Sequence, residues 1–245
     1  MEAVLVDFHG TIAQVEDPVD WVLAAAQACG LSLPRLRATA LADLLVAAGR
    51  AGGPLPQRVP PHLVEEWANR DLYEYAHRAA YTGLARAGLD RAGLDRGPDG
   101  SAASAAAQLP EALYDRLLVP DGWTLYPDTL PTLAALHRQR VPIAVVSNIG
   151  FDIRPVAEAL GFARYIDAFV LSYEVGRCKP DPAIFQHACT KLGVPPERAL
   201  MVGDTPADGA AVHAGCRAYL LPPAPAGTTN GLAAVLRLVG VDPSD

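Results

Sequence analysis

The sequence predicts an α/β fold, a Rossmann-like core with a parallel sheet and an inserted all-helical domain. After residue 121, short apolar segments typical of buried strands alternate with segments of helical periodicity. Near the start of the chain a single apolar segment, 3–6, is followed by residues 16–120, which contain helical patterns and no convincing strand. We therefore expect a core made of residues 1–15 and 121–245, with the helical domain formed by residues 16–120.

Helix start and stop signals divide the inserted domain. Asp17 and Pro18 begin its first helix, because Asp is a good N-cap and Pro suits the first turn, and Gly30 ends it. Further helices are expected after Pro34 up to about Gly49, at about 61–81 and at about 104–118. Residues 83–101 include the sequence Arg-Ala-Gly-Leu-Asp twice in succession and are interpreted as a loop or a frayed helix.

The core elements are expected in alternation along the chain. The strands are predicted at 3–6, 142–146, 168–171, 199–202 and 217–220. The helices are predicted at 129–140, 151–160, 181–192, 206–214 and 232–239. Such an order requires parallel strands joined by right-handed crossovers, and ligands then bind beyond the carboxyl ends of the strands.

Composition excludes several classes of function. Hydrophobic residues make up 51% of the chain and the net charge is −7, so the sequence predicts a large core and disfavours nucleic-acid or anionic-membrane binding through bulk charge. No apolar run approaches the ~18 residues that a membrane span needs. The N-terminus lacks the features of a signal peptide, and the four cysteines show no CxxC spacing. We expect a cytoplasmic protein with reduced cysteines.

Polar residues gather where the predicted strands end. Asp7, Ser147 and Asp204 each follow a strand at the same edge of the sheet. The full predicted cluster is Asp7, Ser147, Asn148, Lys179, Asp204 and Asp208. Three carboxylates close together repel one another, and a divalent cation relieves that repulsion. An all-oxygen site with few protein ligands suits Mg²⁺.

Each of these signals has a simpler structural explanation when taken alone. Asp7 could cap the end of a strand, and Lys179 could be a solvated surface residue. Asp204 and Thr205 before Pro206 are also typical of a helix N-terminus. Four such segments in this order, each after a strand or beside a loop, favour a functional site.

Four motifs together resemble those of the haloacid dehalogenase-like hydrolase superfamily, in its phosphatase type with a helical cap. They are Asp-Phe-His-Gly-Thr at 7–11, Val-Ser-Asn at 146–148, Gly-Arg-Cys-Lys-Pro-Asp-Pro at 176–182 and Val-Gly-Asp-Thr-Pro-Ala-Asp at 202–208. The resemblance spans residues 1 to about 222. The insertion at 16–120 lies where that family carries its helical cap.

The resemblance implies a role for each motif residue. Asp7 would attack phosphorus and form an aspartyl-phosphate, and Lys179 would pair with Asp7 and the phosphoryl oxygens. Thr11 would lie beside Asp7, while Ser147 and Asn148 would bind the oxygens of the transferring group.

The resemblance also implies a metal site. Asp7, Asp204 and the backbone carbonyl of His9 would ligate Mg²⁺, and Asp208 would do so directly or through water. The expected activity is therefore Mg²⁺-dependent hydrolysis of a small phosphorylated metabolite by a monomer or homodimer.

His9 departs from the family pattern, because phosphatases of the superfamily usually carry an Asp two residues after the nucleophile. That Asp protonates the leaving oxygen and then activates water. Three alternatives follow. His9 replaces the Asp as acid and base, since imidazole titrates near pH 6.5. Alternatively, the enzyme uses substrates with good leaving groups, or the protein has lost catalysis and is a binding or scaffold protein.

Two related chemistries can be weighed from the residues. The phosphonate-cleaving branch uses a cap lysine, and residues 16–120 contain none. A metal-free 2-haloacid dehalogenase is a further alternative, with Arg35 or Arg37 holding the substrate carboxylate. Asp204 stands where that branch has a neutral residue, and Phe185 stands where it has Tyr, so this alternative is disfavoured.

Overall fold

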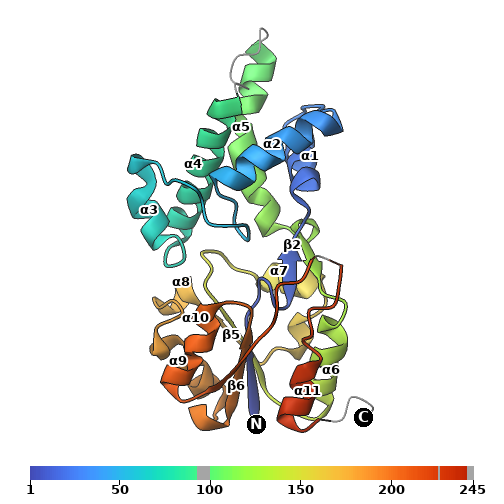
Figure 1. Cartoon of the computed structure of the whole chain (residues 1–245), viewed down its shortest axis with the longest axis vertical. Helices are drawn as coiled ribbons and strands as arrows, with labels where there is room; N and C mark the ends of the chain where they lie inside the picture. Colours follow the sequence, from blue (N-terminus) through green and yellow to red (C-terminus); the bar gives the residue numbers. More distant parts are fainter. Residues whose placement is uncertain (93–99, 226, 242–245) are drawn as a thin grey trace. The chain divides into compact units, whose positions relative to one another are not determined.

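The computed structural model describes residues 1–92, 100–225 and 227–241. It divides into two compact units. The sheet unit comprises residues 1–14 and 124–245, and the helical unit comprises residues 15–123. Figure 1 shows the elements of both units. The α/β fold class is confirmed, with a parallel sheet in one unit and helices in the other.

The sheet unit is built on five parallel strands in the order β5-β4-β1-β6-β7. The strands are β1 (Ala3–Val6), β4 (Ile143–Ser147), β5 (Ala168–Leu171), β6 (Ala199–Gly203) and β7 (Arg217–Leu220). Val6 at the end of β1 lies level with Val145 of β4 and Val202 of β6. This register brings the carboxyl ends of the three central strands to one edge, where Asp7 begins the loop after β1.

Helices cover both faces of the sheet (Figure 1). One face carries α6 (Thr129–Arg138), α7 (Arg154–Ala159) and α11 (Ala234–Val239), and the other carries α9 (Pro182–Leu192) and α10 (Pro206–Gly209). The short helix α8 (Ser172–Val175) follows β5 directly. Asp181 caps α9 by accepting a hydrogen bond from the backbone N–H of Ala183 at 2.9 Å.

Coverage of both faces explains why the strands are apolar without alternation. Every residue of β1, β4 and β6 is buried. Leu5, Val146 and Met201 belong to a core cluster with Ile184 and Phe185 of α9. Burying such side chains stabilises the fold by about 1.5–3 kcal/mol each, so the central strands provide a firm platform for the loops at their ends.

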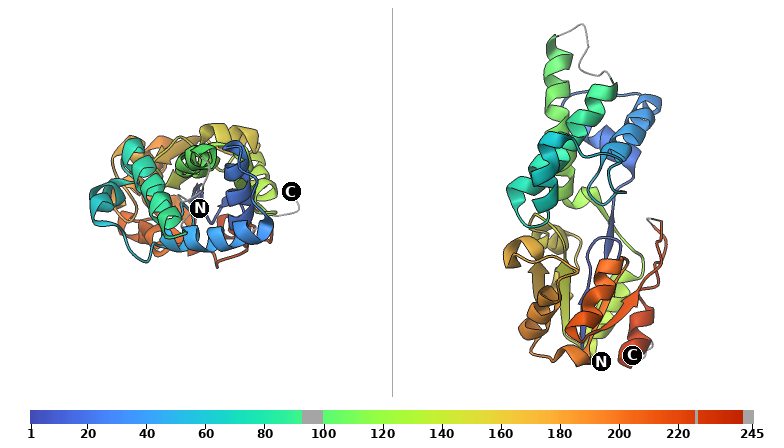
Figure 2. Two further views of the ribbon diagram at one scale, coloured as in Figure 1. Left: turned by 90° about the horizontal axis from the view of Figure 1, so that it is seen from above. Right: turned by 60° about the vertical axis from the view of Figure 1, so that its left-hand side comes forward.

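The helical unit consists of five α-helices among its described residues. They are α1 (Pro18–Ala28), α2 (Arg35–Ala48), α3 (Val64–Asn69), α4 (Glu74–Ala92) and α5 (Gly100–Asp115). Contacts link α1 to α2, α2 to α4, α4 to α5 and α5 back to α1, and Figure 2 gives two further views of these helices, coloured blue to green. The predicted cap of α1 is confirmed, since Asp17 accepts hydrogen bonds from Val19 and Asp20 at 2.8 and 3.3 Å.

The third predicted helix, at 61–81, is helical but not continuous. A 3₁₀ turn at Pro61–Leu63 leads into α3, the helix breaks, and α4 continues to Ala92. Residues 83–101, interpreted as a loop or a frayed helix, are helical at 83–92 and at 100–101, and residues 93–99 lie outside the described part. The glycines at 83 and 88 are close helix contacts: a Cβ on Gly83 would lie 2.6 Å from Leu63, and one on Gly88 would lie 3.2 Å from Ala48.

A two-stranded sheet, not predicted from the sequence, pairs β2 (Ala13–Val15) with β3 (Trp123–Leu125). The boundary between the two units falls within both strands. Thr129 donates a hydrogen bond to the carbonyl of Ile12 at 2.8 Å, which ties the chain before β2 to α6. Among the described residues, no helix combines the length and apolar character of a membrane span.

Candidate active site

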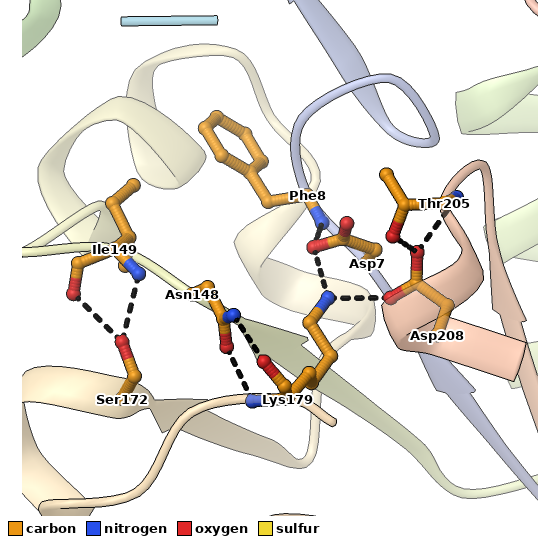
Figure 3. A network of polar contacts seen from close by, with 8 residues as sticks. All are labelled: Asp7, Phe8, Asn148, Ile149, Ser172, Lys179, Thr205 and Asp208. Carbon is orange, nitrogen blue, oxygen red and sulfur yellow. Dashed lines mark hydrogen bonds and ion pairs between the residues drawn. The ribbon is translucent and has the colours of Figure 1, made fainter. Parts of the chain in front are cut away.

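Asp7 lies at the end of β1, where the chain leaves the sheet. It is only 7% exposed. Its Oδ1 accepts a hydrogen bond from the backbone N–H of Phe8 at 2.7 Å and forms an ion pair with Lys179 Nζ at 2.9 Å (Figure 3). The carboxylate is thus held in one orientation, with Oδ2 outside these two contacts.

Lys179 joins two carboxylates inside the protein. Its Nζ lies 2.6 Å from Asp208 Oδ1 and 2.9 Å from Asp7 Oδ1, and the side chain is 3% exposed. Burial lowers the pKa of Lys179, but the charges of Asp7 and Asp208 outweigh burial and raise this pKa above its ordinary value. The ammonium is therefore a fixed positive charge beside Asp7.

Asp208 is held by the start of α10 and is fully buried. Its Oδ2 accepts hydrogen bonds from the backbone N–H of Thr205 at 3.0 Å and from Thr205 Oγ1 at 2.6 Å. These contacts form a capping box, so the local sequence Thr-Pro-Ala-Asp fixes the carboxylate. Because Oδ1 contacts Lys179, both oxygens of Asp208 have protein partners. Asp208 therefore orients Lys179 toward Asp7.

Asp204 completes a group of three carboxylates. Asp7, Asp204 and Asp208 each offer an oxygen within 4.8 Å of the others. Burial and the charge of Asp208 raise the pKa of Asp204. Burial, together with the charges of Asp208 and Asp204, raises the pKa of Asp7 to about 7 against the opposing charge of Lys179. The cluster thus contains more negative charge than its one ammonium balances.

The residues of this cluster fit a divalent cation. Asp204 Oδ1 is buried and has no hydrogen-bond partner among the described residues. A buried carboxylate oxygen without a partner is unfavourable, and a bound cation would satisfy it. Gly10 (φ +79°) keeps the space open, because a Cβ there would lie 2.2 Å from Asp204 Oδ2. Carboxylate oxygens facing one another across a small space are typical ligands of Mg²⁺.

The predicted phosphate-binding residues lie at the same end of the sheet unit. Ser147 ends β4 and is 3% exposed, and Thr11 is fully buried in the loop after β1. The Asn148 side chain donates to the Lys179 carbonyl at 2.8 Å and accepts from the Lys179 N–H at 2.7 Å. Asn148 therefore clamps the backbone that carries the lysine (Figure 3). Binding of phosphoryl oxygens by Thr11, Ser147 and Asn148 stays a prediction.

His9 lies in a tight loop and is half-buried. Gly10 N–H donates to the Ala13 carbonyl at 2.8 Å, and Ile12 N–H donates to the Phe8 carbonyl at 2.9 Å. His9 itself forms an isolated backbone bridge with Ala13. The loop conformation is thus stabilised by main-chain bonds that any residue at position 9 permits. Its role in acid–base chemistry, and its carbonyl as a metal ligand, stay predictions.

Two supporting residues were not found from the sequence. Ser172, fully buried, accepts from the Ile149 N–H at 2.8 Å and donates to the Ile149 carbonyl at 3.2 Å. It directly follows β5, so its place at a strand end could have revealed it. Asn230 Nδ2 donates to the Thr11 carbonyl at 2.8 Å across 219 positions of sequence. No local pattern near Asn230 indicates that contact.

A family model for the haloacid dehalogenase-like hydrolases matches residues 1–215. The chain belongs to this family. The resemblance drawn from its four motifs is thereby confirmed, and the protein is a hydrolase of this superfamily.

Relatives and solved structures resemble this hydrolase to different extents. A phosphoserine phosphatase from Thermus thermophilus is 37% identical over 109 residues, which are 44% of this chain and 42% of that protein. The chain spans less than half the length of the curated relatives it matches.

Two crystal structures share the fold over nearly the whole chain. A 2-haloacid dehalogenase from Pseudomonas syringae has a TM-score of 0.58 at 21% identity, covering 98% of both chains. A phosphatase of the superfamily from Thermococcus onnurineus has a TM-score of 0.57 at 22% identity, covering 99% of both. At this identity the likeness concerns the fold alone.

Proposed function

We propose that this hydrolase is an Mg²⁺-dependent phosphatase that cleaves a small phosphorylated metabolite through an aspartyl-phosphate on Asp7, with the helical unit as its cap. The observation that carries the proposal is the buried Lys179 ammonium held between Asp7 and Asp208 at 2.9 and 2.6 Å. A fixed cation beside a carboxylate nucleophile suits an anionic substrate, because it offsets the repulsion between the two negative groups.

The residues divide the reaction between them. Oδ2 of Asp7 is the oxygen that attacks phosphorus, since the contacts with Phe8 and Lys179 occupy Oδ1. As the new O–P bond forms, the ester O–P bond breaks and the leaving oxygen takes a proton. Water then cleaves the aspartyl-phosphate, releasing phosphate and restoring Asp7. Lys179 neutralises charge on the transferring group throughout.

Asp7, Asp204 and the His9 carbonyl would hold Mg²⁺, and Asp208 would ligate it directly or through water while it orients Lys179. When bound, the cation supplies neutralisation of the carboxylate charge and of the substrate phosphate. The orphaned Oδ1 of Asp204 and the raised pKa of Asp7, about 7, support this assignment.

His9 is the proposed acid and base in place of the usual Asp. It would protonate the leaving oxygen first and then accept a proton from the attacking water. The second candidate function is a binding protein with the same fold that has lost catalysis. This second candidate is motivated by His9, which stands where the catalytic Asp is expected. The contacts among Asp7, Lys179 and Asp208 do not involve the side chain of His9, so the charged cluster could persist without catalysis.

The similarity to a phosphoserine phosphatase supports a phosphate ester as substrate. The acidic cluster supports the same class against a dehalogenase. Without a cation, a third carboxylate would repel the anion of a 2-haloacid. The oxygens of a phosphate ester, by contrast, can share a bound Mg²⁺ with the carboxylates.

The test compares hydrolysis of an aryl phosphate and an alkyl phosphate, with Mg²⁺ and with EDTA. We expect turnover by the native protein with Mg²⁺ only, and none by Asp7→Asn. Acid–base catalysis raises reaction rates by about 10²–10⁴-fold. His9→Ala should therefore lose more of its rate on the alkyl phosphate than on the aryl phosphate, because the alkyl leaving group needs a proton. His213→Ala, at an exposed histidine, is the matched control.

The variant His9→Asp separates the two candidates. A native enzyme that slows on this change uses His9 as a working acid and base. A silent native protein that gains activity on it has an intact nucleophile and metal site, and a binding role is then favoured. Full activity of Asp7→Asn would overturn the proposed mechanism.

A further inference from the structure

The helical unit contains a buried arginine, Arg50, in the turn that follows α2. Arg50 is 6% exposed. The turn begins at Gly49, whose φ of +124° favours glycine, and a Cβ there would lie 2.8 Å from Leu84 Cδ1. The Gly53 N–H then closes the turn on the Arg50 carbonyl at 3.0 Å. The backbone thus directs a long charged side chain into the interior of the unit.

The guanidinium of Arg50 has no anionic partner among the described residues. Its Cζ lies 4.3 Å from the centroid of the Trp21 ring, and its Nε is buried without a hydrogen bond. The two carboxylates that act on it electrostatically are Glu16 and Asp17. Glu16 is paired with Arg116 at 2.8 Å, and Asp17 caps α1. Neither forms an ion pair with Arg50.

Arg50 faces a small cavity of about 20 Å³, room for about one water molecule. Apolar and aromatic side chains form most of its wall, namely Trp21, Ala51, Tyr81, Ala85, Leu113 and Tyr114. The Tyr114 hydroxyl is already bonded to His77 Nδ1 at 2.8 Å. Among the described residues that line this cavity, only Arg50 carries a charge.

A buried guanidinium with an unpaired N–H is unfavourable, because desolvation is not repaid by a partner. The Trp21 ring recovers part of that cost, but it cannot accept the in-plane hydrogen bond of Nε. Burial lowers the pKa of Arg50 to about 10, against the opposing charges of Glu16 and Asp17, so the group still carries its charge at neutral pH.

We propose that Arg50 and this cavity form a binding site for one small monovalent anion, a halide or a single carboxylate group. An acceptor in the plane of the guanidinium would satisfy Nε and neutralise the charge. A cavity of about 20 Å³ has room for a halide or a carboxylate oxygen but not for a phosphate group. The anion could be free in solution or could be the carboxylate of a larger molecule; the chemistry at Arg50 is the same.

The experiment titrates the full-length protein with sodium formate by calorimetry, at constant ionic strength. Native protein and Arg58→Met, which changes an exposed arginine of the same unit, should bind one formate with equal affinity. Arg50→Met should bind at least tenfold more weakly, and its thermal midpoint without formate should not fall below that of the native protein. Arg50→Lys, which keeps the charge, should retain measurable binding.

Crystals grown in bromide provide a second readout that does not depend on the variants. Anomalous scattering should place bromide beside the Arg50 guanidinium. No saturable formate binding together with no bromide at Arg50 would overturn the proposal, as would equal binding by Arg50→Met. A lower thermal midpoint of Arg50→Met with unchanged formate binding would instead assign Arg50 a purely structural role.

The source of the anion is decided by competition calorimetry. If the anion is the carboxylate of a larger molecule, serine displaces formate from the native protein and from Arg58→Met. If the anion is free in solution, serine leaves formate binding unchanged. Absence of any phosphatase activity would refute the proposed function while leaving the calorimetry and the bromide experiment valid.

Discussion

Replacing the proposed nucleophile should make the metal-free protein more stable. In the folded state the pKa of Asp7 is raised from 3.8 to about 7, chiefly by burial and then by the neighbouring carboxylates. Between these two values the folded state binds a proton that the unfolded state has released, so the stability contributed by this group falls as pH rises from about 4 to 7. Above pH 7 the ionised carboxylate destabilises the fold.

The magnitude follows from the size of the shift. Each pKa unit corresponds to about 1.4 kcal/mol, so ionised Asp7 costs the folded state about 4 kcal/mol at pH 8. Asn removes this charge and keeps an acceptor for the Phe8 N–H, but it weakens the contact with Lys179 by about 1–2 kcal/mol. We expect Asp7→Asn to be about 2–3 kcal/mol more stable than the native chain at pH 8, and nearly equal at pH 5.

The assay is urea denaturation followed by circular dichroism, in EDTA at pH 5 and pH 8. Asp43→Asn, at an exposed aspartate of α2, is the control and should change stability by less than about 0.5 kcal/mol at both pH values. Mg²⁺ should stabilise the native chain more than Asp7→Asn, because the variant has lost a proposed ligand. A variant less stable than the native chain at pH 8, or one with the same gain at both pH values, would refute the reasoning.

Two further predictions concern a glycine and a histidine. Gly10→Ala should weaken Mg²⁺ binding by about tenfold or more, because the new Cβ would lie 2.2 Å from Asp204 Oδ2; Gly161→Ala, with the same φ of +79° and nothing within 4 Å, should show the strain without that loss in a Mg²⁺ titration. Burial, aided by Arg70, lowers the pKa of His77 from 6.5 to about 3, so stability is present above pH 6.5 and lost as pH falls toward 3. From pH 7 to 5 this loss is about 2 kcal/mol, and urea titrations should show it in the native chain and in His62→Gln but not in His77→Gln.

The sheet edge could be predicted from sequence because two local signals coincide there. A buried parallel strand is a short apolar run, and a polar residue directly after it marks the carboxyl end. Asp7, Ser147 and Asp204 carry both signals, and the register of β1 with β4 and β6 brings their strands' ends to one edge. Lys179 was found by motif alone, since no periodicity places a loop lysine near these strands.

The errors arise where contacts distant in sequence decide the structure. Gly83 and Gly88 have low helix propensity, yet α4 includes them because its neighbours approach too closely for a side chain. The pairing of β2 with β3 is likewise non-local, and three residues are too few to show alternation. Asn230 contacts the loop after β1 through long-range hydrogen bonds from its Nδ2 to the carbonyls of Gly10 and Thr11, which leave no pattern near any of these residues.

The residues that control charge at the site are separate from position 9, where proton transfer is proposed. Asp7 is oriented by the Phe8 N–H and Lys179, and Lys179 is oriented by Asp208 and, through its backbone, by Asn148. None of these contacts uses the side chain of residue 9. A substitution there can therefore change the acid–base step while the nucleophile and the proposed cation site persist. The fold of the loop therefore tolerates His9 at a position where phosphatases of the superfamily are expected to carry Asp. His9→Asp should therefore alter how the rate of hydrolysis depends on the leaving group and leave the affinity for Mg²⁺ unchanged.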